Sequence, residues 1–336
     1  MSHLLKSVPL KRIGIPVLIL LALLALKWLP LSQAPTRANP VQPATSIVVQ
    51  LSASPLFPST VAPPVSPQPM PSRTPAQSLS PPPSPSPTPE WTWNPPGEVV
   101  APILIYHHIA KKEPANRYFL SPAIFETQMV ALQRWGYTSI PLSLLVQALT
   151  EGAYLPPRPV VITFDDGYRD VYTQAFPILQ RLGFTGVVYM IAGQVGVGKY
   201  MDSGELSDLA AAGWEIGSHS WTHISLRSPA AKLPHEIDES RRALKKLLHV
   251  PIETFAFPYG LTSKYVTGLV KEADYQAAVG LGGSFRHTEK TRYYLSRIEV
   301  RSNYDLKRFA SLLPWSGALP GATPPSHDEQ RGVTGQ

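Results

Sequence analysis

The chain has 336 residues, of which 43% are hydrophobic, so it has material for one ordinary globular domain and for additional segments. Cysteine is absent, which excludes disulfides and thiolate metal ligands. The formal net charge of +7 is mild for this length and is compatible with anionic wall polymers or lipid headgroups nearby, but no Lys/Arg-rich run indicates a nucleic-acid partner.

The first 31 residues have the pattern of a membrane segment. Lys6, Lys11 and Arg12 precede an apolar stretch at residues 13–31, which as a helix would rise about 28 Å, close to the ~30 Å hydrocarbon thickness of a bilayer. The basic flank predicts that this end stays in the cytoplasm. A cleaved signal peptide is the alternative, because Thr36-Arg37-Ala38 resembles a cleavage site. Both interpretations predict an exported chain, either membrane-anchored or secreted.

A low-complexity segment follows at residues 32–97. Half of the 38 prolines lie between residues 31 and 97, and the only charged residues there are Arg37, Arg73 and Glu90. Such a composition cannot bury a core, so we expect an extended, disordered tether with a bias to polyproline II. The polar tail at residues 316–336 is also expected to be disordered.

Between these segments, residues 98–315 have the pattern of one α/β domain. Apolar strand-like runs alternate with amphipathic stretches, which favours βα units around a parallel sheet. Ser121 and Pro122 start one helix, and Phe125, Met129 and Leu132 supply its buried face. The predicted strands are residues 103–107, 160–164, 186–192, 214–218, 254–257 and 276–279, and the further predicted helices are residues 206–212, 233–248 and 263–273.

Two acidic residues follow one of these strands. The β-branched run at residues 159–162 leads into Thr163-Phe164-Asp165-Asp166-Gly167. Asp-Asp-Gly alone is a common turn sequence, but about 50 residues later His219 and His223 lie four apart, directly after another predicted strand. One carboxylate and two imidazoles are a ligand set suited to Zn²⁺ with a fourth position open to water. The second carboxylate is then available as a base.

With these two motifs the chain resembles the NodB-type polysaccharide deacetylases, carbohydrate esterase family 4. Thr163 to Gly167 is similar to their first motif, and His219-Ser220-Trp221-Thr222-His223 to their second, His-Ser/Thr-x-x-His. Their third motif, Arg-x-Pro-Tyr-Gly, reads Ala256-Phe257-Pro258-Tyr259-Gly260 here. The resemblance covers roughly residues 98–315 and implies a distorted (β/α)7 barrel, in which reactive groups lie at the carboxyl ends of the strands.

The resemblance also implies a role for each site residue. Asp166, His219 and His223 would hold a divalent metal, for which this donor set favours Zn²⁺ and also accommodates Co²⁺ or Ni²⁺. The metal would lower the pKa of its bound water and polarise an N-acetyl carbonyl, and Asp165 would be the general base. The backbone N–H of Tyr259 would stabilise the oxyanion, and a protonated histidine would donate to the departing amine.

The acid histidine has no match to the usual late Leu-x-His motif, because none follows residue 260. His287 lies in a setting typical of a loop. The segment at residues 103–109, Ile-Leu-Ile-Tyr-His-His-Ile, resembles a rearranged branch that includes the poly-β-1,6-N-acetylglucosamine deacetylases, in which the first strand carries the acid. We therefore expect His107 to be the acid, with His108 as the alternative. A capping role at the strand end is the other interpretation of either residue.

Ala256 takes the position of the arginine that orients the base in the common third motif, so Asp165 needs another partner. Arg297, in Leu295-Ser296-Arg297-Ile298-Glu299-Val300, resembles an arginine segment of the same rearranged branch. We expect Arg297 near the site, the alternative being a surface arginine on an alternating strand.

The sequence thus predicts a membrane-anchored, monomeric, metal-dependent hydrolase that removes N-acetyl groups from a cell-wall or extracellular polysaccharide containing N-acetylglucosamine. Trp221, Pro258 and Tyr259 are its candidate substrate contacts. Two alternatives stay open. One is an O-acetyl esterase for xylan-like polymers on the same barrel, which the missing arginine permits. The other is a non-catalytic polysaccharide-binding protein, against which the intact acidic and histidine residues argue.

Overall fold

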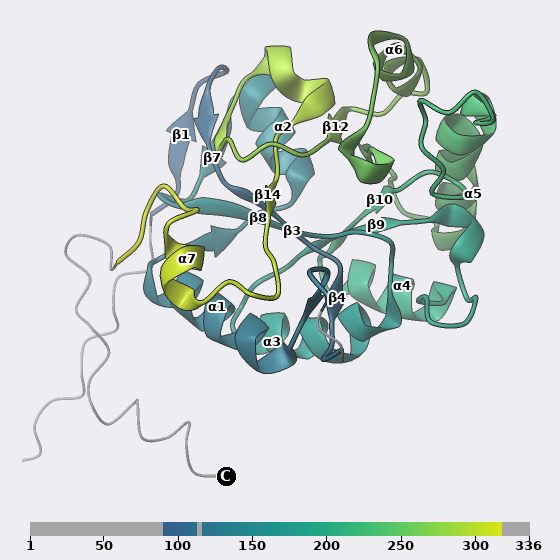
Figure 1. Cartoon of the computed structure of the whole chain (residues 1–336). Helices are drawn as coiled ribbons and strands as arrows, with labels where there is room; N and C mark the ends of the chain where they lie inside the picture. Colours follow the sequence, from purple (N-terminus) through teal and green to yellow (C-terminus); the bar gives the residue numbers. More distant parts are fainter. Residues whose placement is uncertain (1–89, 113–115, 318–336) are drawn as a thin grey trace, which may run out of the picture. The chain divides into compact units, whose positions relative to one another are not determined.

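The computed structural model describes residues 90–112 and 116–317 (Figure 1). Within these ranges, no helix has the length and apolar character needed to cross a membrane. The predicted membrane segment at residues 1–31 lies outside them, as do residues 32–89 of the predicted tether and residues 318–336 of the predicted tail.

A curled parallel sheet forms the centre of the domain (Figure 1). Its strands follow the order β12-β11-β10-β9-β8-β3-β14, and the short strand β6 (Thr138–Ser139) also pairs with β8. An isolated parallel bridge between Val279 and Leu295 links the end of β12 to the segment that leads into β14. This α/β architecture is consistent with the NodB-type barrel. In chain order the strands are β3 (Ile103–Tyr106), β8 (Pro159–Phe164), β9 (Val187–Met190), β10 (Glu215–Ser218), β11 (Thr254–Ala256), β12 (Ala277–Val279) and β14 (Ile298–Glu299).

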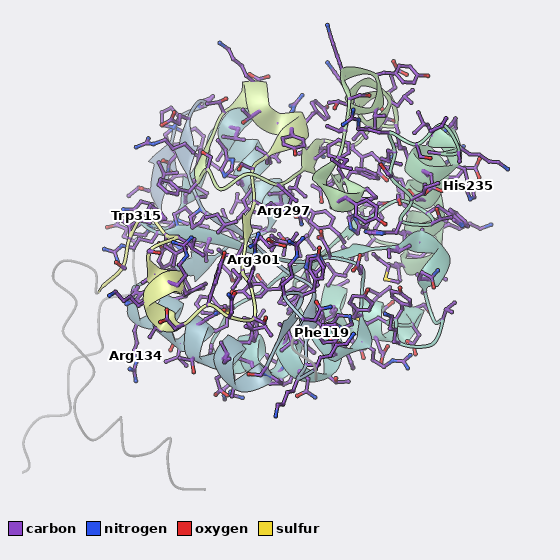
Figure 2. All side chains as sticks on the ribbon, viewed as in Figure 1. Phe119, Arg134, His235, Arg297, Arg301 and Trp315 are labelled. Atoms are coloured by element: carbon purple, nitrogen blue, oxygen red, sulfur yellow. The ribbon has the colours of Figure 1, made fainter. Side chains whose placement is uncertain are left out.

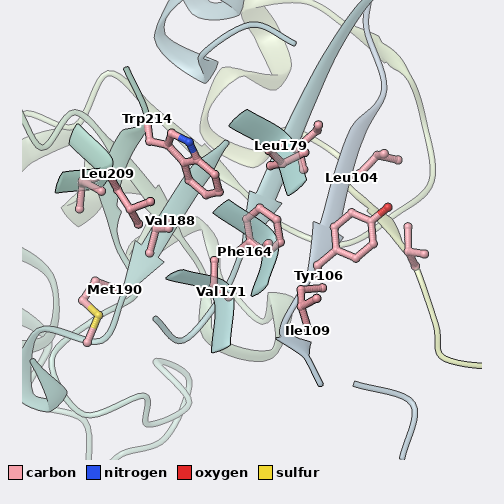
Figure 3. Close-up of a cluster of buried hydrophobic side chains, with 14 of the residues drawn as sticks. Leu104, Tyr106, Ile109, Phe164, Val171, Leu179, Val188, Met190, Leu209 and Trp214 are labelled. Atoms are coloured by element: carbon pink, nitrogen blue, oxygen red, sulfur yellow. The ribbon is translucent and has the colours of Figure 1, made fainter. Parts of the chain in front are cut away.

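Alternate residues of the strands pack on opposite faces of the sheet. Val160, Ile162 and Phe164 of β8 belong to the larger hydrophobic cluster, part of which is shown in Figure 3, whereas Val161 belongs to a second cluster. Because both faces are covered, all six residues of β8 are buried, which explains the continuous apolar run in its sequence. The same alternation directs Asp165, two residues beyond Thr163, to the inner side of the curled sheet.

Seven α-helices surround the sheet in the described residues (Figure 1). In the predicted helix at residue 122, the Ser121 hydroxyl accepts a hydrogen bond from the Ile124 N–H, and Phe125, Met129 and Leu132 are fully buried, which confirms its predicted cap and core face. The helices are α1 (Pro122–Arg134), α2 (Leu142–Thr150), α3 (Phe176–Arg181), α4 (Ser203–Ala211), α5 (Ser240–Leu248), α6 (Lys264–Glu272) and α7 (Leu306–Ala310).

The folded part begins earlier than the predicted boundary at residue 98. Strand β1 (Thr92–Asn94) pairs antiparallel with β7 (Ala153–Leu155), and the Trp93 ring packs against Tyr154 at a centroid distance of 5.4 Å. Gly152 leaves the room for this indole, since a Cβ there would lie 2.7 Å from the Trp93 ring. Three residues inside a proline-rich composition carry no periodic signal, and cross-strand pairing decides their structure.

His287 lies in a strand, not in the loop that its sequence setting indicated. Strand β13 (Arg286–His287) pairs antiparallel with β2 (Val99–Val100), and the buried His287 donates from Nε2 to the carbonyl of Ala101 at 3.0 Å. Burial lowers the pKa of His287 to about 4. His287 is therefore a neutral structural residue.

Candidate metal centre and active site

The carboxyl ends of several sheet strands open into one cavity of about 380 Å³. His107 follows β3, Asp165 and Asp166 follow β8, His219 follows β10, and Tyr259 lies beyond β11. All of them line this cavity, together with His223 and Arg297. Parallel strands end at the same edge of a sheet, so residues far apart in sequence meet here.

Asp166, His219 and His223 form a cluster with the geometry of a metal site. One ligand atom from each lies within 4.8 Å of the others. Asp166 Oδ1 is 3.6 Å from His219 Nε2 and 3.4 Å from His223 Nε2. This oxygen is buried and has no hydrogen-bond partner among the described residues, which is costly for a carboxylate unless a cation binds it. The donor set therefore fits a divalent cation, and one oxygen with two imidazole nitrogens suits zinc.

Backbone geometry holds the ligand atoms in these positions. Asp166 and His223 adopt left-handed φ values of 72° and 63°, which turn each side chain sharply out of its preceding segment. His219 donates from Nδ1 to the carbonyl of Ala256 at 2.8 Å, which leaves the lone pair of Nε2 directed toward Asp166. Burial lowers the pKa of His219 and so keeps the ring in the neutral form that binds metals.

Arg297 forms a bidentate salt bridge with Asp165. Nη1 and Nη2 donate to the two carboxylate oxygens at 2.6 and 2.7 Å, and Nε donates to the carbonyl of Gly280 at 3.0 Å. Arg297 lies in the middle of the domain in Figure 2, with a side chain only 1% exposed. Burial alone would raise the pKa of Asp165, but the charge and the hydrogen bonds of Arg297 hold it well below its usual range. Asp165 is therefore ionised and held in one orientation, as a proton acceptor needs to be.

The position of Arg297 explains how Ala256 can stand where the common third motif has an arginine. The side chain of Ala256 is buried in the second hydrophobic cluster, and the guanidinium that contacts Asp165 comes instead from the residue directly before β14. Because β14 pairs with β3, and β3 with β8, the arginine reaches the carboxylate from two strands away.

The two candidate acid histidines lie in different surroundings. The His108 ring is stacked between Phe119 and Tyr168, at centroid distances of 3.8 and 3.6 Å, and its Nδ1 is 2.5 Å from Asp170 Oδ2. His107 lines the cavity with its ring 4.7 Å from Tyr118. Burial lowers the pKa of His107, against the opposing charges of Asp165 and Asp166. Packing on both faces makes His108 a fixed element of the wall.

Comparison with known proteins agrees with this site. The family model "Polysaccharide deacetylase" matches residues 153–278. A putative polysaccharide deacetylase of Bacillus subtilis is 26% identical over 200 residues, covering 59% of this chain and 71% of that protein. A poly-β-1,6-N-acetyl-D-glucosamine N-deacetylase of Staphylococcus aureus is 25% identical over 211 residues, covering 58% of this chain and 72% of that protein. Residues 153–278 therefore match a polysaccharide deacetylase domain, and the chain is similar to enzymes of that family.

Solved structures of deacetylases share the fold. The crystal structure of a putative polysaccharide deacetylase from Bacillus anthracis superposes with a TM-score of 0.59 at 26% identity, covering 64% of this chain and 69% of that one. A Streptococcus pyogenes deacetylase, at 22% identity and a TM-score of 0.59, shows the same fold. By this similarity the chain is a hydrolase of the polysaccharide deacetylase type.

The deacetylase cavity includes only one of the three predicted substrate contacts. Tyr259 is 57% exposed, and its ring lies 4.7 Å from that of His223. Pro258 is buried and Trp221 packs against His235 at 4.4 Å, and neither lines the cavity in the described structure. The prediction for Trp221 used its place between two ligands, but its ring packs against His235 and does not line the cavity.

Sequence reasoning missed several residues of the deacetylase cavity wall. Most of them come from loops that carry no motif, whereas Phe119 lies in β5 (Phe119–Leu120) and Glu299 in β14. They are Lys112, Asn116, Arg117, Tyr118, Phe119, Lys199, Leu281 and Glu299.

Proposed function

We propose that this chain is a metal-dependent N-deacetylase that uses Zn²⁺ and acts on a cell-wall or extracellular polysaccharide containing N-acetylglucosamine. One observation carries the proposal: a carboxylate held ionised by Arg297 lies in the same cavity as a three-residue metal-ligand cluster. Hydrolysis of an acetamide needs a base beside the water, a stabiliser of the oxyanion and a proton donor for the amine.

Each step has a residue of this chain in reach of the cavity. Asp166, His219 and His223 would hold a metal ion, which would supply Lewis-acid polarisation of the acetyl carbonyl. Asp165 takes the proton of the attacking water. The two hydrogen bonds from Arg297 orient its carboxylate, and the charge of the guanidinium keeps that carboxylate ionised at neutral pH.

The oxyanion and the leaving amine need further groups. Tyr259, at the carboxyl end of β11, contributes its backbone N–H to the oxyanion. His107, which follows β3 and lines the same cavity, protonates the glucosamine nitrogen as the C–N bond breaks.

The staphylococcal relative supports N-acetylglucosamine as the sugar, since its name describes an enzyme of poly-β-1,6-N-acetyl-D-glucosamine. The argument for an O-acetyl esterase rested on a missing arginine, and Arg297 supplies that charge. Residues 1–31 are proposed to keep a monomeric enzyme at the outer face of a membrane, with its catalytic domain outside the cytoplasm.

Removal of the metal tests the proposal directly. The full-length protein should release acetate from a chitooligosaccharide and from a β-1,6-linked N-acetylglucosamine oligomer. A chelator should abolish this release, because the ligands alone polarise no carbonyl, and one equivalent of Zn²⁺ should restore it. Acetate release at full rate in the chelator, with no metal bound by elemental analysis, would contradict the metal-dependent mechanism.

A variant of His107 separates the acid from the metal site. His107→Ala should retain its metal and lower kcat by about 10²- to 10⁴-fold, because the amine then departs without a proton. The measurement is steady-state acetate release beside zinc content. Near-normal turnover with full metal content would remove His107 from the mechanism.

A further inference from the structure

Three basic side chains stand at the mouth of the catalytic cavity. Lys112 and Arg117 come from the segment after β4 (His108–Ile109), and Lys199 from the loop before α4. All three line the cavity, and we call them the basic rim. None of them belongs to a motif identified above.

Aromatic rings order each of these long side chains. Lys112 Nζ lies 4.6 Å from the centroid of the Phe119 ring, and Arg117 Cζ lies 4.6 Å from that of Tyr118. Lys199 Nζ lies 4.5 Å from the Tyr168 ring centroid. A cation over a ring is attracted by the ring quadrupole, so these charges are positioned in advance of any ligand.

The acidic residues of the cavity leave the basic rim largely uncompensated. Asp165 is neutralised by Arg297, and Asp166 belongs to the metal cluster. Glu299 lies 2.7 Å from Arg301 Nε and 3.7 Å from Arg117 Nε, so it is shared between two arginines. No carboxylate of the described residues forms a salt bridge with Lys112 or Lys199. A divalent cation bound by the metal cluster would add further positive charge.

This charge distribution bears on the substrate. We propose that the basic rim selects an N-acetylated polysaccharide that carries anionic groups beside the acetamido sugar. The inference rests on the proposed deacetylase function and narrows its substrate class. Each deacetylation converts a neutral acetamide into a cationic amine and releases acetate, so the rim also repels stretches of polymer that have already reacted.

Two chitin derivatives that share one polysaccharide backbone but differ in charge test the role of the basic rim. Glycol chitin is neutral and carboxymethyl chitin is anionic, and both keep the acetamide. At low salt the KM of the wild-type protein should be about tenfold lower for carboxymethyl chitin. The difference should shrink as NaCl rises to about 0.3 M, because the Debye length falls below about 8 Å.

Variants test whether the basic rim causes the preference for carboxymethyl chitin over glycol chitin. Lys112→Gln/Lys199→Gln should raise the KM for carboxymethyl chitin about four- to twenty-fivefold more than the KM for glycol chitin, since each screened pair contributes a factor of about two to five. Lys199→Arg, which keeps the charge, should retain the preference. The control Lys246→Gln/Lys290→Gln removes the same net charge from α5 and from the turn at Glu289–Tyr294, outside the cavity lining, and should leave both KM values unchanged.

A binding measurement separates this inference from the proposed function. Fluorescence anisotropy with labelled carboxymethyl chitin in the presence of a chelator requires no turnover. Tighter binding by the wild type than by the Lys112→Gln/Lys199→Gln variant supports the rim even if neither polymer is deacetylated, an outcome that would count only against the proposed function.

Competitors identify the anionic group. Displacement by poly-L-glutamate indicates carboxylates, and stronger displacement by polyphosphate indicates phosphates. Equal affinity for glycol chitin and carboxymethyl chitin at low salt, or displacement by neither polyanion, overturns the inference.

Discussion

Replacing Arg297 with methionine should lower kcat/KM for acetate release by about a hundredfold to a thousandfold and also destabilise the domain. Asp165 would lose both of its guanidinium hydrogen bonds and would remain a buried carboxylate without a counter-charge. Breaking one partner of such a pair costs about 3–5 kcal/mol of unfolding free energy. A base that is misplaced or protonated accounts for the kinetic loss. Chemical denaturation and steady-state kinetics measure the two effects.

A double variant distinguishes a positioning role from a general structural one. Asp165→Asn/Arg297→Met removes both charges, so it should recover part of the stability lost in Arg297→Met while remaining inactive. Arg301→Met is the matched control, because Arg301 contacts the partly exposed Glu299 and not Asp165. If Arg297→Met keeps kcat/KM within a factor of two, Arg297 does not orient the base.

The second large effect is expected at Asp166. Asp166→Ala should bind less than a tenth of the zinc that the wild type retains after dialysis, and acetate release should fall on the order of 10³-fold or more. Only two neutral imidazoles would remain, and the sole charged ligand of the cluster would be gone. Elemental analysis and isothermal titration with Zn²⁺ report the metal site without reference to activity.

His235→Ala is the matched control for Asp166→Ala. His235 lies near Trp221 and Glu239, away from the cavity lining, and it should bind zinc and release acetate as the wild type does. An Asp166→Ala protein that retains stoichiometric zinc at the wild-type affinity would refute the assignment of the ligands.

The strands whose ends carry the site residues could largely be predicted from local sequence. The buried run at Pro159–Phe164 alternates between the two faces of the sheet, so its period alone directs Asp165 inward. The strand before His219 was predicted from the same kind of signal and is confirmed. Parallel strands that end in polar residues converge at one edge, which is why the Asp and His motifs could be expected to meet.

Side-chain direction beyond a strand end was harder to predict. Trp221 lies between two cavity residues in sequence, yet its ring packs against His235. The backbone changes direction at Ser220 and His223, which both have left-handed φ values. The basic rim comes from loops whose lysines look like ordinary solvated charges in the sequence. Strand β1 depends on pairing with β7, a contact across 60 residues that no local pattern contains. In each case tertiary contact, not propensity, determines the outcome.

The neighbouring positions of β3 and β14 make the chemistry of the domain depend on its last core strand. During translation Asp165 leaves the ribosome 132 residues before Arg297 does. A nascent or truncated product that ends before Arg297 would have to bury a carboxylate with nothing to neutralise it, and its sheet would lack the strand beside β3. Such fragments would stay open and accessible to proteases, so only the complete domain acquires both its fold and its reactive carboxylate.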